Sequence, residues 1–187
     1  MPTYVVTGAA RGLGYAFIKL LASDPANTVI GLVRNSTTAR ARLAPDSITN
    51  VHVIPADITD KVAMKRAAEE SREVLDGKGL DVLICNAAYI SEVSALKSVQ
   101  EFEQDTLTLF DDAEKSFNVN VLGTLKTVFA FLPLIQEGQL KKVVATSSGM
   151  GDIDLINEAK ISNVVPYALS KAALRTLFAK LAAAYEE

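Results

Sequence analysis

The chain contains little that could hold a metal ion or form a disulfide. Its 187 residues include one cysteine, Cys85, one histidine, His52, and no tryptophan. A single cysteine excludes an internal disulfide. One cysteine and one histidine are too few to supply the usual ligands of a zinc ion, so no metal site is expected. The low cysteine content suits a reducing compartment and predicts a cytoplasmic protein. Because His52 lies in the apolar run 51–54, a place in a strand is favoured over a catalytic triad.

Long apolar runs and an excess of positive charge are also missing, and no secretory leader is expected. The unbroken apolar runs are far shorter than a bilayer span, and no basic segment precedes an apolar one at the N-terminus. The net charge is −3 and the basic residues are scattered, so no nucleic-acid or membrane partner is expected. Hydrophobic residues make up 49% of the chain, which predicts one folded domain over residues 1–187.

Short apolar strands alternate with helical patterns along the whole chain. The expected strands are 4–6, 28–33, 51–54, 80–85 and 142–146. The expected helices are 15–22, 36–43 after Asn35 or Ser36, 61–75 after Thr59 or Asp60, one from Asp111 or Asp112 to about 135, and 166–185. The stretches 89–109, with a short helix near 99–102, and 150–165 are expected to be loops. This alternation predicts an α/β fold, a doubly wound parallel sheet between two helix layers with strand order 3-2-1-4-5.

A turn rich in glycine joins the first expected strand to the first expected helix. Gly8, Gly12 and Gly14 follow the spacing G-x-x-x-G-x-G. Glycines let the backbone approach a pyrophosphate closely, and the start of the helix offers N–H groups and a positive dipole end. The turn therefore predicts a dinucleotide site, although the stretch alone is also compatible with an ordinary strand-to-helix turn.

A second set of residues suggests proton transfer. Tyr167 and Lys171 lie four residues apart, on one face of the last expected helix, where an ammonium group would lower the pKa of the phenol. Ser148 follows the fifth strand, at the edge where parallel sheets bind ligands. The alternative for Ser148 is a loop serine that caps backbone groups. Tyr15 and Lys19 share the spacing, but no hydroxyl partner is evident, so a solvated helix face is expected there.

Taken together, these motifs resemble the short-chain dehydrogenase/reductase family, which has a Rossmann fold. The matching residues, in chain order, are Thr7–Gly14 with Arg11 and Leu13, Asp57 and Ile58, Asn86-Ala87-Ala88, Asn120-Val121-Leu122-Gly123, Ser148-Gly149-Met150-Gly151, and Tyr167 with Lys171. Three further segments are similar to the fungal norsolorinic-acid-ketoreductase-like branch of the family, namely 31–35, 131–135 and 147–150.

The resemblance implies a hydride transfer to a ketone. Tyr167 would protonate the carbonyl oxygen, Ser148 would hold that oxygen, Lys171 would lower the pKa of Tyr167 and bind ribose, and Asn120 would hold a water that links Lys171 to solvent. The residues expected to bind the cofactor are Gly8, Arg11, Gly12, Leu13, Gly14, Arg34, Asn35, Asp57, Ile58, Asn86, Ala87, Ala88, Tyr167 and Lys171.

The charge at the end of the second strand favours NADP(H). NAD-binding proteins usually place an acid there, whereas this chain has Arg34, and Arg11 in the glycine turn adds a second cation. A solvated arginine at a strand end is the alternative.

Two departures from the family pattern bear on activity. Ala88 replaces a glycine, and nothing follows the Tyr167 helix, where the family continues with further strands and a substrate-covering helix. The expectation is a C-terminally incomplete domain with an exposed fifth strand, either a fragment or a truncated product. The alternative function is an inactive NADP-binding or dimerisation module.

The resemblance also implies partners. The helices 112–135 and 166–185 would form a dimer or tetramer. Ile90, Ile153, Leu155 and Ile156 suggest a pocket for a small apolar or aromatic carbonyl substrate, although they suit the core equally.

Overall fold

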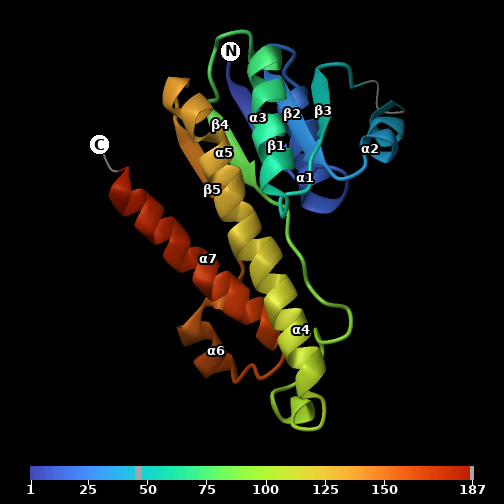
Figure 1. Ribbon diagram of the computed structural model, residues 1–187, viewed down its shortest axis with the longest axis vertical. Coiled ribbons are helices and arrows are strands. Elements are labelled where there is room, and N and C mark those ends of the chain that lie inside the picture. The colour runs from blue at the N-terminus through green and yellow to red at the C-terminus, as the bar shows by residue number, and fades with distance from the viewer. Residues whose placement is uncertain (45–47, 186–187) are drawn as a thin grey trace. The chain divides into compact units, whose positions relative to one another are not determined.

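The computed structural model of the chain describes residues 1–44 and 48–185 (Figure 1). Contacts divide the chain into two units. The first unit consists of residues 1–87 and 124–146, and the second of residues 88–123 and 147–187. The expectation of one domain over 1–187 stays a prediction.

The first unit contains a five-stranded parallel sheet. Its order is β3-β2-β1-β4-β5, as the sequence predicted. The strands are β1 (Thr3–Thr7), β2 (Thr28–Val33), β3 (Val51–Pro55), β4 (Val82–Cys85) and β5 (Lys142–Ala145). β4 begins two residues later than expected, because the N–H of Leu80 donates to the Leu134 carbonyl and that of Asp81 to the Thr3 side-chain hydroxyl. Neither N–H bonds to the backbone of a neighbouring strand.

Helices lie on both faces of this sheet. α1 (Gly12–Ala22) and α2 (Ser36–Leu43) bury Ile18, Ala39 and Leu43 against Val6 and Val29 of the strands. Successive side chains of a strand point to opposite faces, so the intervening strand residues face α3 (Lys61–Leu75) and α5 (Thr124–Glu137). The predicted arrangement of helices, sheet and helices is confirmed.

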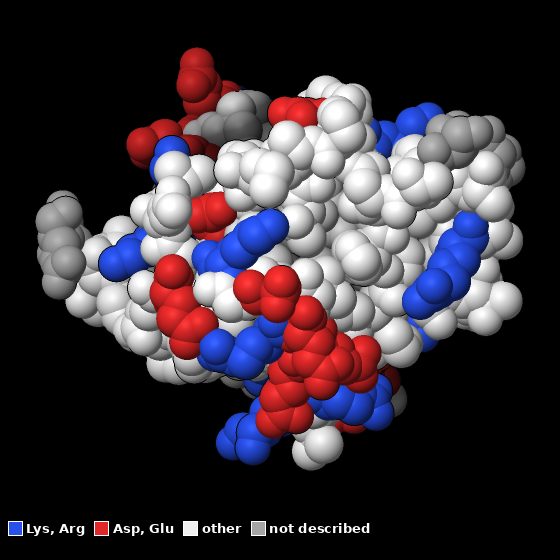
Figure 2. Space-filling model, turned by 90° about the horizontal axis from the view of Figure 1, so that it is seen from above, with Lys and Arg blue, Asp and Glu red and all other residues white. Residues whose placement is uncertain are grey.

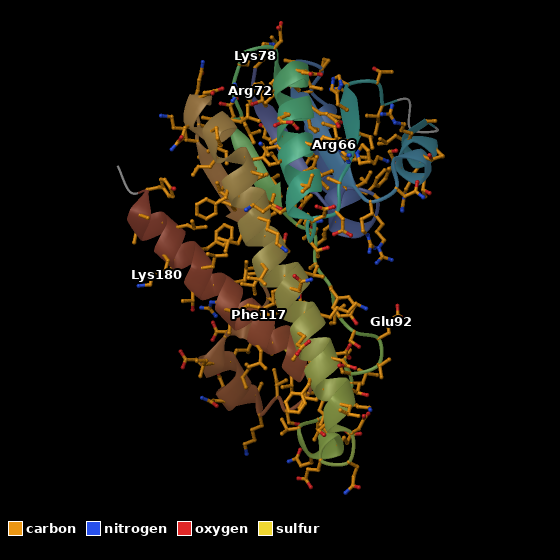
Figure 3. The ribbon with its side chains drawn as sticks, in the orientation of Figure 1. Arg66, Arg72, Lys78, Glu92, Phe117 and Lys180 are labelled. Carbon is orange, nitrogen blue, oxygen red and sulfur yellow. The ribbon has the colours of Figure 1, made fainter. Side chains whose placement is uncertain are left out.

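α3 has the bounds that its amphipathic pattern predicted. The Asp60 side chain accepts hydrogen bonds from the N–H groups of Val62 and Ala63 and so caps its start. Arg72, labelled in Figure 3, forms a bidentate ion pair with Glu137 of α5, with N–O distances of 2.7 and 3.0 Å. Both ends of α3 are therefore stabilised by polar side chains, which do not belong to the periodic pattern of its apolar residues.

Asp81 joins the beginnings of three strands. Its carboxylate accepts hydrogen bonds from the N–H groups of Thr3 at 2.9 Å, Gln139 at 2.9 Å and Leu140 at 3.1 Å. Burial acts to raise the pKa of Asp81, but these donors outweigh it and hold the pKa below its usual value.

The helix expected from Asp111 or Asp112 begins earlier. α4 spans Thr106–Phe117, and the Asp105 side chain caps it by accepting from the Thr108 N–H at 3.4 Å. Residues 106–109, assigned to a loop, are thus helical. The error arose because Leu107 is 77% exposed, so the first turn of α4 contributes little to an apolar stripe.

A π-helical segment, η3 (Asn118–Gly123), separates α4 from α5. Apolar residues recur every three or four positions along this stretch, but they do not all share one buried face, because Phe117 is 43% exposed whereas Val121 and Val128 are buried. A π turn contains an extra residue, which shifts the phase of the side chains on either side of it.

The helical stretch 106–137 is long and apolar enough, by length and composition, to span a bilayer, and half of the relevant window is buried. A helix that packs into a protein core shows the same length, composition and burial.

The second unit holds the remaining helices. These are η2 (Gln100–Phe102), η4 (Gly149–Gly151), α6 (Ile153–Ala159) and α7 (Val165–Ala184). α4 packs against α7. The short helix near 99–102 and the last helix are confirmed, but the loop expected over 150–165 contains α6. None of the residues of α6 is buried, so no apolar periodicity marks it.

Charged side chains of both signs are intermixed on the face drawn in Figure 2, as the scattered sequence charges predicted.

Candidate functional site

The glycine turn has a backbone that other residues would not tolerate. Gly8 has φ +68°, and a Cβ there would lie 2.9 Å from the Ala87 Cα. A Cβ on Gly14 would lie 2.3 Å from the Gly8 carbonyl oxygen and 2.5 Å from the Asn86 amide nitrogen. The turn is therefore packed directly against the segment that follows β4, and two of its glycines are required for that packing.

The start of α1 is suited to an anion. No side chain caps it, its first turn carries no acid, and Arg11, Gly12 and Leu13 are exposed. Backbone N–H groups at an uncapped helix start, together with the helix dipole, favour a phosphate group. These residues fit the pyrophosphate of a dinucleotide cofactor.

Thr7 and Asn86 connect the ends of β1 and β4. The Thr7 hydroxyl accepts from the N–H groups of Asn86 and Ala87, both at 3.0 Å, and the Asn86 amide donates to the Thr7 carbonyl at 3.1 Å. The sequence motif singled out Asn86 and Ala87 for the cofactor and did not show that Thr7 holds them. Ala88, in the second unit, is exposed.

Asp57 lies at the end of β3 with its carboxylate already engaged. It accepts from the Thr59 N–H at 2.9 Å and the Thr59 hydroxyl at 2.8 Å, while Lys126 donates to the Thr59 carbonyl at 2.8 Å. Burial acts to raise the pKa of Asp57, but the two Thr59 bonds, with the charges of Arg34 and Lys126, hold it below its usual value. Ile58, the other residue expected here, is buried.

Arg34 and Asn35 lie at the end of β2. Both are exposed, and the Asn35 side chain accepts from the Thr38 N–H at 3.0 Å, which confirms it as the cap of α2.

A third cation, missed in the sequence, lies near the glycine turn. The Arg42 guanidinium lies 4.5 Å from the centre of the Tyr15 ring and donates to the Ala10 carbonyl at 3.5 Å. The Tyr15 hydroxyl donates to the Arg42 carbonyl at 3.0 Å, so the expectation of a merely solvated face at Tyr15 is wrong. The two residues are 27 positions apart, which is why no local pattern revealed the contact.

The side-chain amide of Asn120 makes three hydrogen bonds. It is 1% exposed and lies in the π segment η3. Its amide accepts from the Tyr89 N–H at 2.7 Å and donates to the Tyr89 carbonyl at 2.9 Å and to the Ser170 hydroxyl at 2.9 Å. Ser170 in turn donates to the Tyr167 carbonyl at 2.7 Å. Ser170 stands within the Tyr167–Lys171 motif, but the sequence gave no signal for its role.

Lys171 is buried beside the predicted acid. It is 2% exposed, and its Nζ lies 5.4 Å from the centre of the Tyr167 ring. Burial lowers the pKa of Lys171, because an ammonium ion loses its hydration. The structure thus places Tyr167, Lys171 and Asn120 around one turn of α7.

Ser148 begins the segment that packs against the same helix. Its hydroxyl accepts from the Met150 N–H at 3.2 Å, which is the capping interaction that the alternative interpretation predicted. Three residues later, a Cβ on Gly151 would lie 2.7 Å from the Lys171 carbonyl carbon. The η4 segment is therefore fixed against α7 at Lys171.

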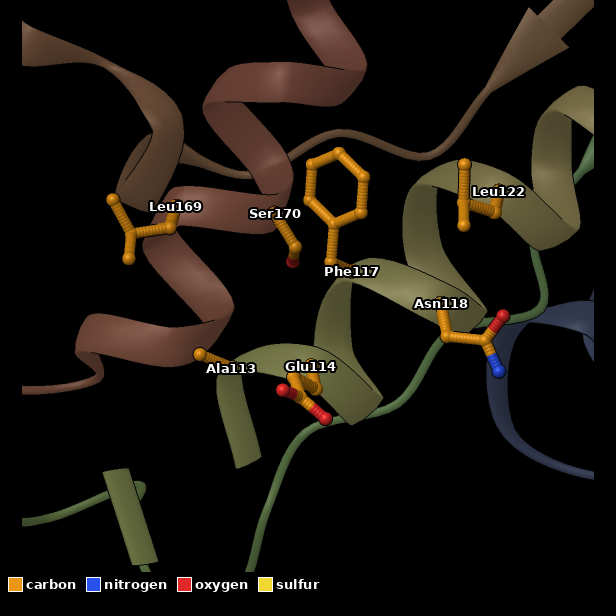
Figure 4. Close-up of a pocket in the computed structure, with 7 residues that line it drawn as sticks. All are labelled: Ala113, Glu114, Phe117, Asn118, Leu122, Leu169 and Ser170. Atoms are coloured by element: carbon orange, nitrogen blue, oxygen red, sulfur yellow. The ribbon is translucent and has the colours of Figure 1, made fainter. Parts of the chain in front are cut away.

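Two apolar hollows lie in the second unit. One, of about 430 Å³, is lined by Ala113, Glu114, Phe117, Asn118, Leu122, Leu169 and Ser170. Figure 4 shows the α4 and η3 side chains opposite Leu169 and Ser170 of α7. The other, of about 200 Å³, includes Met150 and Ile156. Of the four residues expected in a pocket or core, Ile156 lines the second hollow, whereas Ile90, Ile153 and Leu155 are exposed and so do not belong to the core.

No cluster of metal-binding side chains occurs among the described residues. Cys85 is buried, which raises the pKa of its thiol to about 12.

Comparison with known proteins identifies the family. The family model described as short chain dehydrogenase matches residues 2–187. The chain belongs to the short-chain dehydrogenase/reductase family. The short-chain dehydrogenase/reductase AacuF of Aspergillus aculeatus is 47% identical over 96% of this chain and 66% of its own length. The short chain dehydrogenase virK of Hypocrea virens is 43% identical over 100% of this chain and 69% of its own length.

Solved structures agree with the fold. The NADPH-bound carbonyl reductase from chicken fatty liver has a TM-score of 0.81 and 27% identity, over 99% of this chain and 74% of that one. The chain therefore belongs to a family of oxidoreductases that bind nicotinamide cofactors, as the sequence predicted. It spans about two thirds of the length of the curated relatives it matches.

Proposed function

We propose that the protein reduces a ketone with NADPH, with Tyr167 as the general acid. The observation that carries the proposal is the burial of Lys171 beside the Tyr167 ring, on a helix turn that Asn120 and Ser170 hold in place. An unperturbed phenol has a pKa of ~10, so a neighbouring ammonium is needed for proton transfer near neutral pH.

Each residue has a distinct task in this proposal. Tyr167 donates its proton to the carbonyl oxygen, and Ser148 donates a hydrogen bond to that oxygen. Lys171, a buried ammonium group beside the Tyr167 ring, is placed to stabilise the negative charge that develops on the Tyr167 oxygen as the proton leaves. NADPH, when bound, supplies the hydride.

Asn120 is proposed to connect Lys171 to solvent through a water. Both amide N–H groups of Asn120 are already donated, to Tyr89 and Ser170. The water would therefore be held by an oxygen atom of Asn120, that of the side chain or that of the backbone.

The preference for NADPH over NADH rests on charge. Arg11, Arg34 and Arg42 surround the ends of β1 and β2, and within the described residues none of them forms an ion pair with a carboxylate. The guanidinium group suits a phosphate dianion such as the 2′-phosphate of NADP. The chicken carbonyl reductase, a distant relative, is described as NADPH-bound.

Oxidation of NADPH in the presence of aromatic ketones and quinones tests the proposal. The unaltered chain should turn over, and Tyr167→Phe, which keeps the ring and removes only the hydroxyl, should lose at least ~100-fold in kcat while retaining its affinity for NADPH. Turnover that survives Tyr167→Phe would refute the assignment of the acid.

The second candidate is a cofactor-binding or dimerisation module without turnover. It is favoured by exposed apolar side chains on the helices of 112–135 and 166–185, since Phe117, Leu122, Phe129 and Leu169 are 39–59% exposed. A second copy would cover these side chains in a dimer or tetramer. NADPH binding without turnover, with a dimeric mass in sedimentation, would support this candidate.

The substrate is proposed to be a small apolar or aromatic carbonyl compound, handled in the cytoplasm. Ile153 and Leu155, which are 70% and 41% exposed, follow the Ser148 segment and offer apolar contacts.

A further inference from the structure

Tyr89 is held at both its backbone and its side chain. Its N–H and carbonyl both bond to the Asn120 amide, at 2.7 and 2.9 Å. Its hydroxyl donates to the Asp112 carboxylate at 3.1 Å, and the Lys115 Nζ lies 4.3 Å from the centre of its ring. Asn120 is thus fixed by a residue that is itself fixed by α4.

Asp112 accepts a hydrogen bond from one hydroxyl of the segment 89–94, that of Tyr89, at 3.1 Å. Burial acts to raise its pKa, but the hydroxyls of Ser91, Ser94 and Tyr89, with the charge of Lys115, hold the pKa below its usual value. Ser91 also accepts from the N–H of Ser94 at 3.1 Å, which closes this segment into a turn. A charged acceptor makes strong hydrogen bonds, so Asp112 is a suitable anchor for the Tyr89 side chain.

Asp112, Ser116 and Asn120 are spaced four residues apart along α4 and η3. Ser116 and Asn120 are buried, at 0% and 1% exposure. The link from Asp112 to Asn120 runs through Tyr89, which bonds to both residues.

We propose that Asp112 is a positioning residue of the reductase. It fixes the Tyr89 side chain, the backbone of Tyr89 then orients the Asn120 amide, and Ser170 transmits that orientation to the turn of α7 that carries Tyr167. The effect on catalysis rests on the function proposed above, whereas the anchoring itself does not.

Asp112→Asn tests this role, with Asp111→Asn as the matched control. Asp111 is exposed, on the same helix, and undergoes the same chemical change. Asp112→Asn should lower kcat by about tenfold or more, as expected for weakening hydrogen bonds to a charged group, and leave KM for NADPH within about twofold. Asp111→Asn should change neither value.

Tyr89→Phe is the second variant, because it removes one oxygen and preserves packing. It should lower kcat in the same way, and the double variant with Asp112→Asn should be no slower than the slower single variant, since the two groups act as one unit. Losses that multiply in the double variant would overturn the proposal.

Hydrogen exchange on the cofactor-free chain gives a readout independent of turnover. Peptides covering 85–95 and 116–124 should exchange faster in Asp112→Asn and Tyr89→Phe, and not in Asp111→Asn. Unchanged exchange would overturn the anchoring, and faster exchange with unchanged kcat would overturn the effect on catalysis. If the unaltered chain has no turnover but the two variants still exchange faster, the proposed function is refuted and the anchoring remains supported.

Discussion

Replacing Asp81 with asparagine should destabilise the first unit strongly and in a pH-dependent way. One carboxylate oxygen accepts the N–H groups of Gln139 and Leu140, and the other accepts the N–H of Thr3. Asparagine has one oxygen and one amide NH₂, so it can serve only one of these two groups. Its NH₂ would then face N–H donors that have lost their acceptor.

The magnitude follows from these contacts. At least one hydrogen bond to a charged group is lost, worth ~1.5–3 kcal/mol, and a buried N–H is left without a partner. We therefore expect Asp81→Asn to lower the free energy of unfolding by about 3 kcal/mol at pH 7.

The pH dependence has a definite sign. The pKa of Asp81 is lower in the folded chain than the ~3.9 of an unfolded aspartate, so its stabilisation is complete above that value and is lost as the pH falls through the folded pKa. Urea unfolding of both chains from pH 7 to pH 2.5 should show the difference shrinking only below pH ~4. A difference under about 1 kcal/mol at pH 7, or one that is constant down to pH 2.5, would refute the reasoning.

Three further outcomes are expected. Gly14→Ala, whose Cβ would meet a backbone oxygen at 2.3 Å, should lower the free energy of unfolding by about 3 kcal/mol or more. Gly12→Ala, with φ +57° and nothing within 4 Å of the Cβ, should lower it by about 1 kcal/mol. Equal losses of Tm would contradict the steric argument. Cys85, with a pKa of about 12, should resist thiol reagents at pH 8 in the native chain and react in urea. Because the pKa of Lys171 is lower in the folded chain, the unfolded chain binds more protons at this residue as the pH rises toward the ~10 of an unfolded lysine. The stability of the unaltered chain should therefore rise relative to that of Lys171→Met as the pH approaches ~10. A fall in relative stability would contradict the burial of Lys171 as a cation.

The parts of the fold set by local patterns were predictable from the sequence. α3 was placed at its observed bounds because an apolar face, an aspartate cap and a following glycine agree over one short stretch. The strand order also followed, since alternating strands and helices leave few topologies.

The errors have physical causes. The first turn of α4 and all of α6 bury too little apolar surface to give a period. The π segment interrupts the phase of the long helix.

The candidate site was predictable only as a set of motifs. Motifs identified Asn120, Tyr167 and Lys171, but the hydrogen bonds around them join residues 31 and 50 positions apart. No local spacing encodes such contacts, so Ser170, Tyr89 and their partners emerge only when the chain is folded.

The distribution of the proposed residues between the two units has a consequence for variants of this protein. Every residue assigned to the nucleotide before Ala88 belongs to the first unit, and Asn120, Ser148, Tyr167 and Lys171 all belong to the second. A chain that has lost its acid should therefore still sequester the dinucleotide. In a cell such a chain would act as a sink that withholds reducing equivalents from active copies, and its effect would grow with its abundance.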